Sequence, residues 1–193
     1  MHIYMSKDYK NEMIGNFLGD FIKGNITSAI DIDSEIKRGL ILHRRIDSFS
    51  EKNIHFKTSK NRFPKHLQRF SPIAIDIIYD HFLAKNFNNI TKERLDLFLE
   101  DFYIHLNNKK FPISQEKQKI IQKIIKENWM YNYQNKEFTK NCILRISKRR
   151  KRLYKLSECC IWFEEEYENL EKDFFKFLPE LTKFVIHTRK NLV

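Results

Sequence analysis

Acidic and imidazole side chains stand among apolar residues in three predicted helices of this chain. They are Asp20 in the first helix, His43 and Asp47 in the second, and Asp76, Asp80 and His81 in the third. Carboxylate and imidazole groups together suit a divalent metal ion such as Mn²⁺, Fe²⁺ or Zn²⁺. Such an ion could polarise a phosphoryl oxygen and activate a water molecule. Arg44 and Arg45 adjoin His43 in the sequence and could clamp a phosphate group.

The third of these helices, residues 71–87, is predicted to be the centre of the fold. Ser71 can cap it, and Pro72 fits its first turn, where no backbone N–H is needed. Its body is apolar on nearly every side, which is typical of a buried helix. Asp76 and Asp80 are four residues apart, so they share a face and repel each other. Two buried carboxylates require a positive partner, which could be a metal ion or a pair of arginines.

Each candidate also has a purely structural interpretation. His43 and Asp47 continue an apolar stripe with Ile36 and Leu40, and a single histidine there is more often a hydrogen-bonded core residue than a ligand. Asp47 could simply pair with Arg44. The apolar surroundings of the third helix are harder to explain in this way. The residues alone therefore leave both a metal or phosphate site and structural ion pairs open.

The elements that must position these groups are predicted to be helices of a single all-α domain over residues 1–193. No stretch alternates with a period of two, and four Gly and four Pro leave little material for turns. Seven to nine helices are expected, with Gly24 and Asn25 as the C-cap of the first and Pro179 interrupting the last. The expected spans are 7–23, 34–49, 55–62, 64–70, 71–87, 91–107, 114–129, 136–149 and 153–190.

The composition narrows the possible partners. The net charge of +11 predicts an acidic partner, which could be nucleic acid, anionic lipid or an acidic protein. No segment approaches the roughly 20 apolar residues of a membrane span. The chain also lacks a signal-peptide apolar region, so a cytoplasmic location is expected. The odd number of cysteines (Cys142, Cys159 and Cys160) and the absence of zinc spacing predict reduced thiols without a framework role.

Four segments resemble the acyl carrier protein phosphodiesterase family. They are residues 15–25 (GNFLGDFIKGN), 42–47 (LHRRID), 71–83 (SPIAIDIIYDHFL) and 146–153 (ISKRRKRL), and their order and spacing match nearly the whole chain. The family resembles the HD-domain metal phosphohydrolases, which implies an HD-domain-like all-α fold and a preference for Mn²⁺. Its known activity is hydrolysis of the phosphodiester between 4′-phosphopantetheine and a serine of holo-acyl carrier protein.

The resemblance also implies roles for residues. The metal ligands are expected to be Asp20, His43, Asp47, Asp76 and Asp80. Catalytic groups are expected at His43, Arg44, Arg45 and His81. The order Asp80–His81 is the reverse of the usual His–Asp doublet of HD proteins. The opening Met1-His2-Ile3-Tyr4 resembles a shortened form of the family's histidine-containing start, which makes His2 a further candidate functional group.

An acidic carrier protein suits a chain of charge +11 through electrostatic steering. The expected contact is the basic run containing Lys148, Arg149, Arg150 and Arg152. Two other functions stay open at this point. One is a phosphohydrolase of nucleotides or other small phosphoesters with the same metal site. The other is a basic all-α binding module for nucleic acid, which the lack of a helix-turn-helix or other reader motif makes the weaker alternative.

Overall fold

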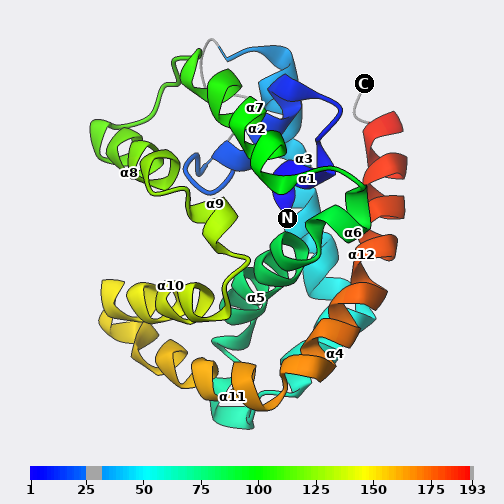
Figure 1. Ribbon diagram of the computed structural model, residues 1–193, viewed down its shortest axis with the longest axis vertical. Coiled ribbons are helices and arrows are strands. Elements are labelled where there is room, and N and C mark those ends of the chain that lie inside the picture. Colours follow the sequence, from blue (N-terminus) through cyan, green and yellow to red (C-terminus); the bar gives the residue numbers. More distant parts are fainter. Residues whose placement is uncertain (25–31, 192–193) are drawn as a thin grey trace. The chain divides into compact units, whose positions relative to one another are not determined.

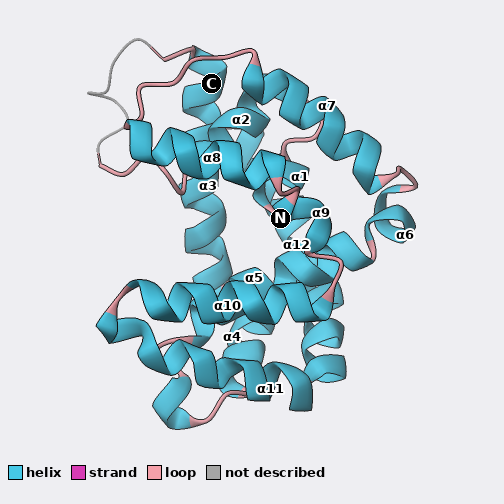
Figure 2. Ribbon diagram, turned by 60° about the vertical axis from the view of Figure 1, so that its left-hand side comes forward, coloured by secondary structure: helices cyan, strands magenta, loops and turns pink. Residues whose placement is uncertain are grey.

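The computed structural model describes residues 1–24 and 32–191, and it is all-α, as predicted (Figures 1 and 2). Over these residues there are twelve α-helices, two 3₁₀ helices and no strand, so the expected seven to nine helices were too few. None of these helices is long and apolar enough to cross a bilayer. The α-helices are α1 (His2–Met5), α2 (Lys10–Leu18), α3 (Ser34–Lys52), α4 (Ile54–Asn61), α5 (Ser71–Lys85), α6 (Phe87–Thr91), α7 (Leu95–Asn107), α8 (Gln115–Lys126), α9 (Trp129–Asn132), α10 (Lys136–Arg149), α11 (Cys159–Glu165) and α12 (Tyr167–Lys190). The 3₁₀ helices are η1 (Lys65–Leu67) and η2 (Lys151–Glu158).

Several helix boundaries follow the sequence signals. Helix α10 covers the predicted span, and Ser114 caps α8 by accepting a hydrogen bond from the backbone N–H of Lys117 at 3.4 Å. The first predicted helix, 7–23, corresponds to the shorter α2, and the preceding α1, which ends before Ser6, was not predicted. Helix α2 ends at Leu18, so Gly24 is not its C-cap, and Asn25 lies outside the described residues.

Three other predictions of helix ends, at Ser71, Thr91 and Pro179, were wrong. The hydroxyl of Ser71 donates to the carbonyl of Gln68 at 3.1 Å and does not cap α5. Thr91 ends α6, where its hydroxyl donates to the carbonyl of Phe87 at 2.8 Å, and does not start α7. Pro179 lies inside α12, which continues to Lys190. A proline removes one backbone donor, and the buried Leu178 and Leu181 on either side hold the helix together through their packing.

The described chain divides into two compact units. The first unit comprises Met1–Phe49, Glu93–Met130 and Leu181–Val193, and the second comprises Ser50–Lys92 and Tyr131–Glu180. The single all-α domain over residues 1–193 stays a prediction. The three cysteines are free and buried, in agreement with their expected lack of a framework role.

A close crossing of α2 and α3 organises the first unit. A Cβ atom added to Gly15 would lie 2.0 Å from the carbonyl oxygen of Ile36, and one added to Gly39 would lie 2.0 Å from that of Glu12. Only glycine permits so short a distance between the two backbones. The crossing places Asn16 of α2 against α3. Beside it lies a core of Met13, Ile14, Phe17, Leu18, Ile36, Leu40, Phe102, Leu106 and Ile121.

The second unit is built around α5. The buried Tyr79 of this helix contacts Phe174 and Phe177 of α12, with ring centroids 5.4 Å and 5.3 Å apart. Its hydroxyl lies 2.8 Å from the hydroxyl of Ser59 in α4. The sequence therefore identified the central helix of this unit correctly.

Candidate metal centre

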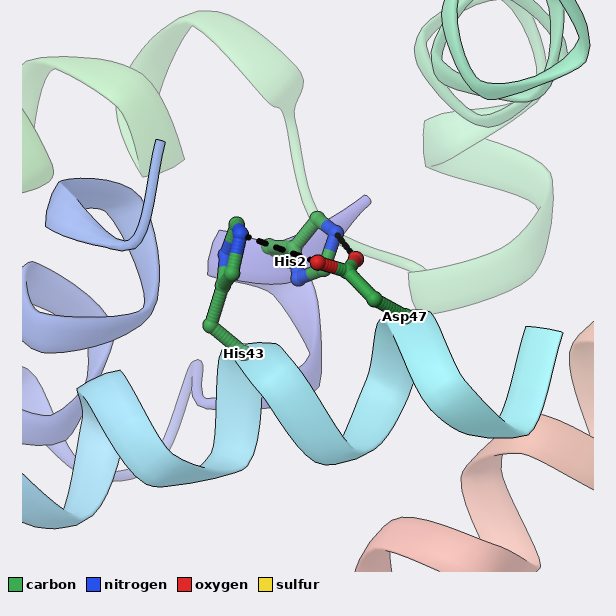
Figure 3. A group of neighbouring side chains, drawn as sticks. All are labelled: His2, His43 and Asp47. Carbon is green, nitrogen blue, oxygen red and sulfur yellow. Dashed lines mark ion pairs between the residues drawn. The ribbon is translucent and has the colours of Figure 1, made fainter. Parts of the chain in front are cut away.

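His2, His43 and Asp47 form a compact cluster within the first unit (Figure 3). One carboxylate oxygen of Asp47 lies 3.3 Å from Nε2 of His2, and the other lies 3.4 Å from Nε2 of His43. The two imidazole rings stack with centroids 4.1 Å apart and an angle of 27° between their planes. One potential ligand atom from each residue lies within 4.8 Å of the other two. Three groups that can bind a metal ion therefore meet at one point.

Local structure explains this convergence. His43 and Asp47 are four residues apart in α3, which places them on one face of the helix, and His2 comes from α1. The ring of His43 is buried, and it lies so close to Gly19 that a Cβ atom there would be 2.1 Å from its Cγ. The side chain of Asp47 is 52% exposed. The cluster is thus closed around the imidazoles and open to solvent at the carboxylate.

The outer contacts of both rings determine which nitrogen faces the cluster. Nδ1 of His43 lies 2.8 Å from the backbone carbonyl oxygen of Asn16, which can only accept a hydrogen bond. Nδ1 of His2 lies 3.1 Å from the side-chain Oδ1 of the same residue. When each Nδ1 donates, each neutral ring presents the Nε2 lone pair to Asp47. Two lone pairs and a carboxylate then face one another without a donor among them, which is an arrangement that fits a bound cation.

The electrostatics favour the forms that bind metals. Burial lowers the pKa of His43, and the charge of a protonated His2 lowers it further, against the opposing effect of Asp47 and Asp20. Burial of Asp47 acts to raise its pKa, but His2 outweighs burial when it is protonated, because it then donates from Nε2 and carries a charge, and the net pKa is lowered. Neutral imidazole and ionised carboxylate are the forms in which these side chains act as metal ligands.

Asp20 lies at the edge of the cluster. One of its carboxylate oxygens is 3.8 Å from Nε2 of His43, and its side chain is exposed. It stands in the turn that follows α2, whereas the sequence pattern placed it inside the first helix. The structure therefore brings together three of the five predicted metal ligands, namely Asp20, His43 and Asp47. Their individual roles as ligands stay predictions.

Asp76 and Asp80 belong to the second unit. Asp76 is exposed and Asp80 is half-buried, so the expectation of two buried carboxylates was wrong. The reason lies in their register, because Ile73, Asp76 and Asp80 follow the exposed side of α5. The pKa of Tyr133 is raised mainly by burial, and the negative charges of both carboxylates raise it further. Their convergence with the first-unit residues stays a prediction.

His81 is buried on the other side of α5, and both of its ring nitrogens have partners. Nδ1 lies 2.7 Å from the carbonyl oxygen of Tyr133, and Nε2 lies 2.8 Å from the hydroxyl of Tyr167. This is the geometry of a histidine that is satisfied within a core. Its predicted catalytic role is not tested by these contacts and stays a prediction.

The cations near the cluster include one that the sequence reasoning did not consider. Arg44 and Arg45 are exposed, and Arg44 donates to the carbonyl of Gly24 at 2.6 Å. Lys23 donates to the carbonyl of Gly19 at 3.2 Å, and its charge helps to lower the pKa of Asp47. Nothing in the sequence around Lys23 indicated that it would lie near the cluster. For His2 there was one indication in the sequence, which was the resemblance of the chain's opening to that of the family.

The fold and the cluster together define an all-α protein with an imidazole–carboxylate site that is suited to a cation. Comparison with known proteins identifies the family. The model of the family "Acyl carrier protein phosphodiesterase" matches residues 1–181, and the chain belongs to this family of phosphodiester hydrolases, as its sequence motifs predicted.

Relatives support this assignment along nearly the full length. The chain is similar to the acyl carrier protein phosphodiesterase of Klebsiella pneumoniae strain 342, with 26% identity over 186 residues covering 94% of each chain. It is also similar to that of Yersinia pestis, with 26% identity over 190 residues covering 96% of each chain. No solved structure matches the chain. The predicted likeness to HD-domain proteins stays a prediction.

Proposed function

We propose that this protein hydrolyses the phosphodiester between 4′-phosphopantetheine and the serine of holo-acyl carrier protein, with a divalent cation held by His2, His43 and Asp47. The observation that carries the proposal is the cluster of acceptor atoms in a chain whose family match spans residues 1–181. The match covers 94% or more of the length of relatives that are named for this activity, which supports the same reaction. With this substrate, the protein is proposed to be a cytoplasmic enzyme of fatty acid and lipid metabolism.

The cation is proposed to be Mn²⁺, because imidazole and carboxylate ligands suit it and the resemblance implies it. It would supply Lewis acidity toward a phosphoryl oxygen and toward water. The residues of the first unit fix where that chemistry takes place. The buried ring of His43 excludes water on one side, and the exposed Asp47 leaves the other side open to a substrate. Asp20 is proposed as a further oxygen ligand near His43. Asp76 and Asp80 stay candidate ligands from the sequence.

Cationic side chains are proposed to bind the phosphoryl group. A diester in the transition state carries negative charge on its non-bridging oxygens, which guanidinium and ammonium groups stabilise. Arg44 and Arg45 are the candidates from the sequence, and His81 is retained as a candidate catalytic group. Lys23 joins them because its charge already acts on Asp47.

The carrier protein is proposed to contact the basic run at the end of α10 and the start of η2. Lys148, Arg149, Arg150 and Arg152 are exposed, so their charges face solvent and can meet acidic side chains. Exposed charge pairs at the rim of an interface act mainly on the association rate and weaken as salt screens them. This surface is therefore expected to set KM more than kcat.

The test is incubation of the purified protein with holo-carrier protein and Mn²⁺, followed by intact-mass measurement of the carrier. The expected result is loss of the phosphopantetheine group in wild type and no loss with Asp47→Asn. The matched control is Asp101→Asn, which removes an exposed carboxylate that pairs with Lys10 within the same unit. Hydrolysis of free nucleotides with no effect on the carrier would refute the proposed substrate while keeping the metal site.

A further inference from the structure

One buried residue, Asn16, contacts both histidines of the cluster through two different groups. Its backbone carbonyl oxygen lies 2.8 Å from Nδ1 of His43, and its side-chain oxygen lies 3.1 Å from Nδ1 of His2. Its side-chain nitrogen donates to the carbonyl of His2 at 2.9 Å and to the hydroxyl of Ser6 at 3.1 Å. Asn16 and Ser6 are both completely buried. Every polar atom of the Asn16 side chain is therefore used.

The orientation of the Asn16 amide follows from a chain of hydrogen bonds with only one consistent direction. Arg189 binds the buried carboxylate of Glu12, with its Nη2 2.6 Å from Oε1. A carboxylate only accepts, so the Ser6 hydroxyl donates its proton to Glu12 at 2.8 Å. The oxygen of Ser6 must then accept from Asn16, which places the amide nitrogen toward Ser6 and the amide oxygen toward His2.

This direction also fixes the histidine tautomers. An amide oxygen and a backbone carbonyl oxygen can only accept, so each of these hydrogen bonds requires a proton on Nδ1. In the neutral ring the other nitrogen, Nε2, is then the unprotonated one, and it faces the carboxylate of Asp47, which competes as a second acceptor for the proton of His2 at 3.3 Å. The isolated imidazole of histidine has no such constraint, because water serves either nitrogen. The tautomers are thus set by Asn16 and not by the rings themselves.

We propose that Asn16 is a positioning residue that fixes both His2 and His43 in the tautomer that binds a cation, with Ser6, Glu12 and Arg189 orienting its amide. This inference rests on the proposed function only in supposing that a cation is the ligand. The tautomers themselves are a property of the metal-free protein. They can be measured even if the carrier protein proves not to be the substrate.

The first measurement is the state of the imidazole nitrogens in the metal-free wild-type protein, by long-range ¹H–¹⁵N NMR at a pH where both rings are neutral. The expected result is a protonated Nδ1 and an unprotonated Nε2 in both His2 and His43. A protonated Nε2 in His2 would overturn the proposal, and this outcome needs no variant and no substrate.

The second measurement uses Asn16→Leu, which removes the side-chain acceptor of His2 and keeps the backbone acceptor of His43. His2 is expected to lose its fixed tautomer while His43 keeps it, and the Mn²⁺ affinity is expected to fall about 10–100-fold. The matched control is Asn11→Leu on the same helix, whose amide oxygen contacts Nε2 of His105 at 3.1 Å. The control should bind Mn²⁺ as wild type does. Unchanged Mn²⁺ affinity in folded Asn16→Leu would refute the positioning role.

If Asn16→Leu does not fold, Ser6→Ala replaces it. This variant removes one of the two acceptors that orient the Asn16 amide and leaves the ion pair of Glu12 with Arg189 in place. The carbonyl of His2 then remains as the acceptor of the amide nitrogen, so the Nδ1-protonated fraction of His2 and the Mn²⁺ affinity should both fall. A single Nδ1-protonated His2 with wild-type affinity in Ser6→Ala would exclude the orienting chain. If the wild-type protein shows the expected tautomers but does not hydrolyse the carrier protein, only the proposed function is refuted.

Discussion

Substituting Gly19 by alanine tests the packing of the cluster most directly. Gly19 has φ −54° and ψ −32°, which alanine adopts readily. Backbone preference alone would therefore stabilise the variant by up to about 1 kcal/mol. The new methyl carbon, however, would lie 2.1 Å from Cγ and 2.4 Å from Cδ2 of His43. The two effects have opposite signs, and the ring contact is the larger.

The size of the effect follows from these distances. Carbon atoms in contact stand roughly 3.5–4.0 Å apart, so the His43 ring must move by about 1.5 Å. Overpacking of this kind costs about 1–3 kcal/mol. A shift of that size also breaks the 2.8 Å hydrogen bond to Asn16 and moves Nε2 away from Asp47. Metal sites tolerate deviations of only about 0.2 Å, so the Mn²⁺ affinity should fall about 100-fold or more.

The assay is a double-mutant cycle by urea unfolding, together with Mn²⁺ titration. In a His43→Ala background the ring is absent, so Gly19→Ala should be neutral or stabilising, which gives a coupling energy of about 1–3 kcal/mol. The control is Gly24→Ala. Gly24 has φ +94°, and among the described residues no atom lies within 4 Å of the place that an added methyl carbon would take, so this change costs stability through backbone strain and leaves Mn²⁺ binding intact. Equal effects of Gly19→Ala in both backgrounds would refute the contact.

Three further outcomes are expected. Asp47→Asn should weaken Mn²⁺ binding without unfolding the protein, because the side chain is half exposed; calorimetric titration and circular dichroism check both parts. Arg189→Leu should cost about 3–5 kcal/mol in urea unfolding, since it leaves the buried carboxylate of Glu12 without its cation, and a loss below about 1 kcal/mol would contradict this. Burial raises the pKa of Cys159 to about 12 and of Cys160 to about 11, so both are thiols at pH 8 and should react with a thiol reagent only after unfolding.

Much of the fold could be predicted because helical periodicity and a few caps are local signals. The spans of α10 and α8 follow from such signals, including the cap at Ser114. The prediction that Pro179 interrupts the last helix was wrong, because burial of neighbouring apolar residues outweighs one missing backbone donor. That burial is a property of the folded chain. Helix α1 was not predicted, and Ser6, which follows its last residue, makes buried contacts with Asn16 and Glu12 that are not visible in the sequence.

The site was predictable where spacing alone decides proximity. His43 and Asp47 share a helix face at a separation of four residues, so the sequence placed them together correctly. The same spacing in Asp76 and Asp80 indicates a shared face but not its burial, and that face is the exposed one. The contact of His2 with Asp47 depends on how α1 packs in the first unit, which periodicity does not specify.

The same cluster bears on proton transfer during the proposed reaction. A histidine that acts as a general base usually receives its carboxylate partner at a protonated nitrogen, which orients and stabilises the ring. Here both Nδ1 atoms contact Asn16, and in the proposed tautomers Asp47 faces the Nε2 lone pairs. Neither neutral ring therefore offers a proton on the side that a substrate could reach. The cluster suits cation binding, and the proton that a serine leaving group requires must come from outside the two imidazoles. Lys23 is an N–H donor whose charge already acts on Asp47.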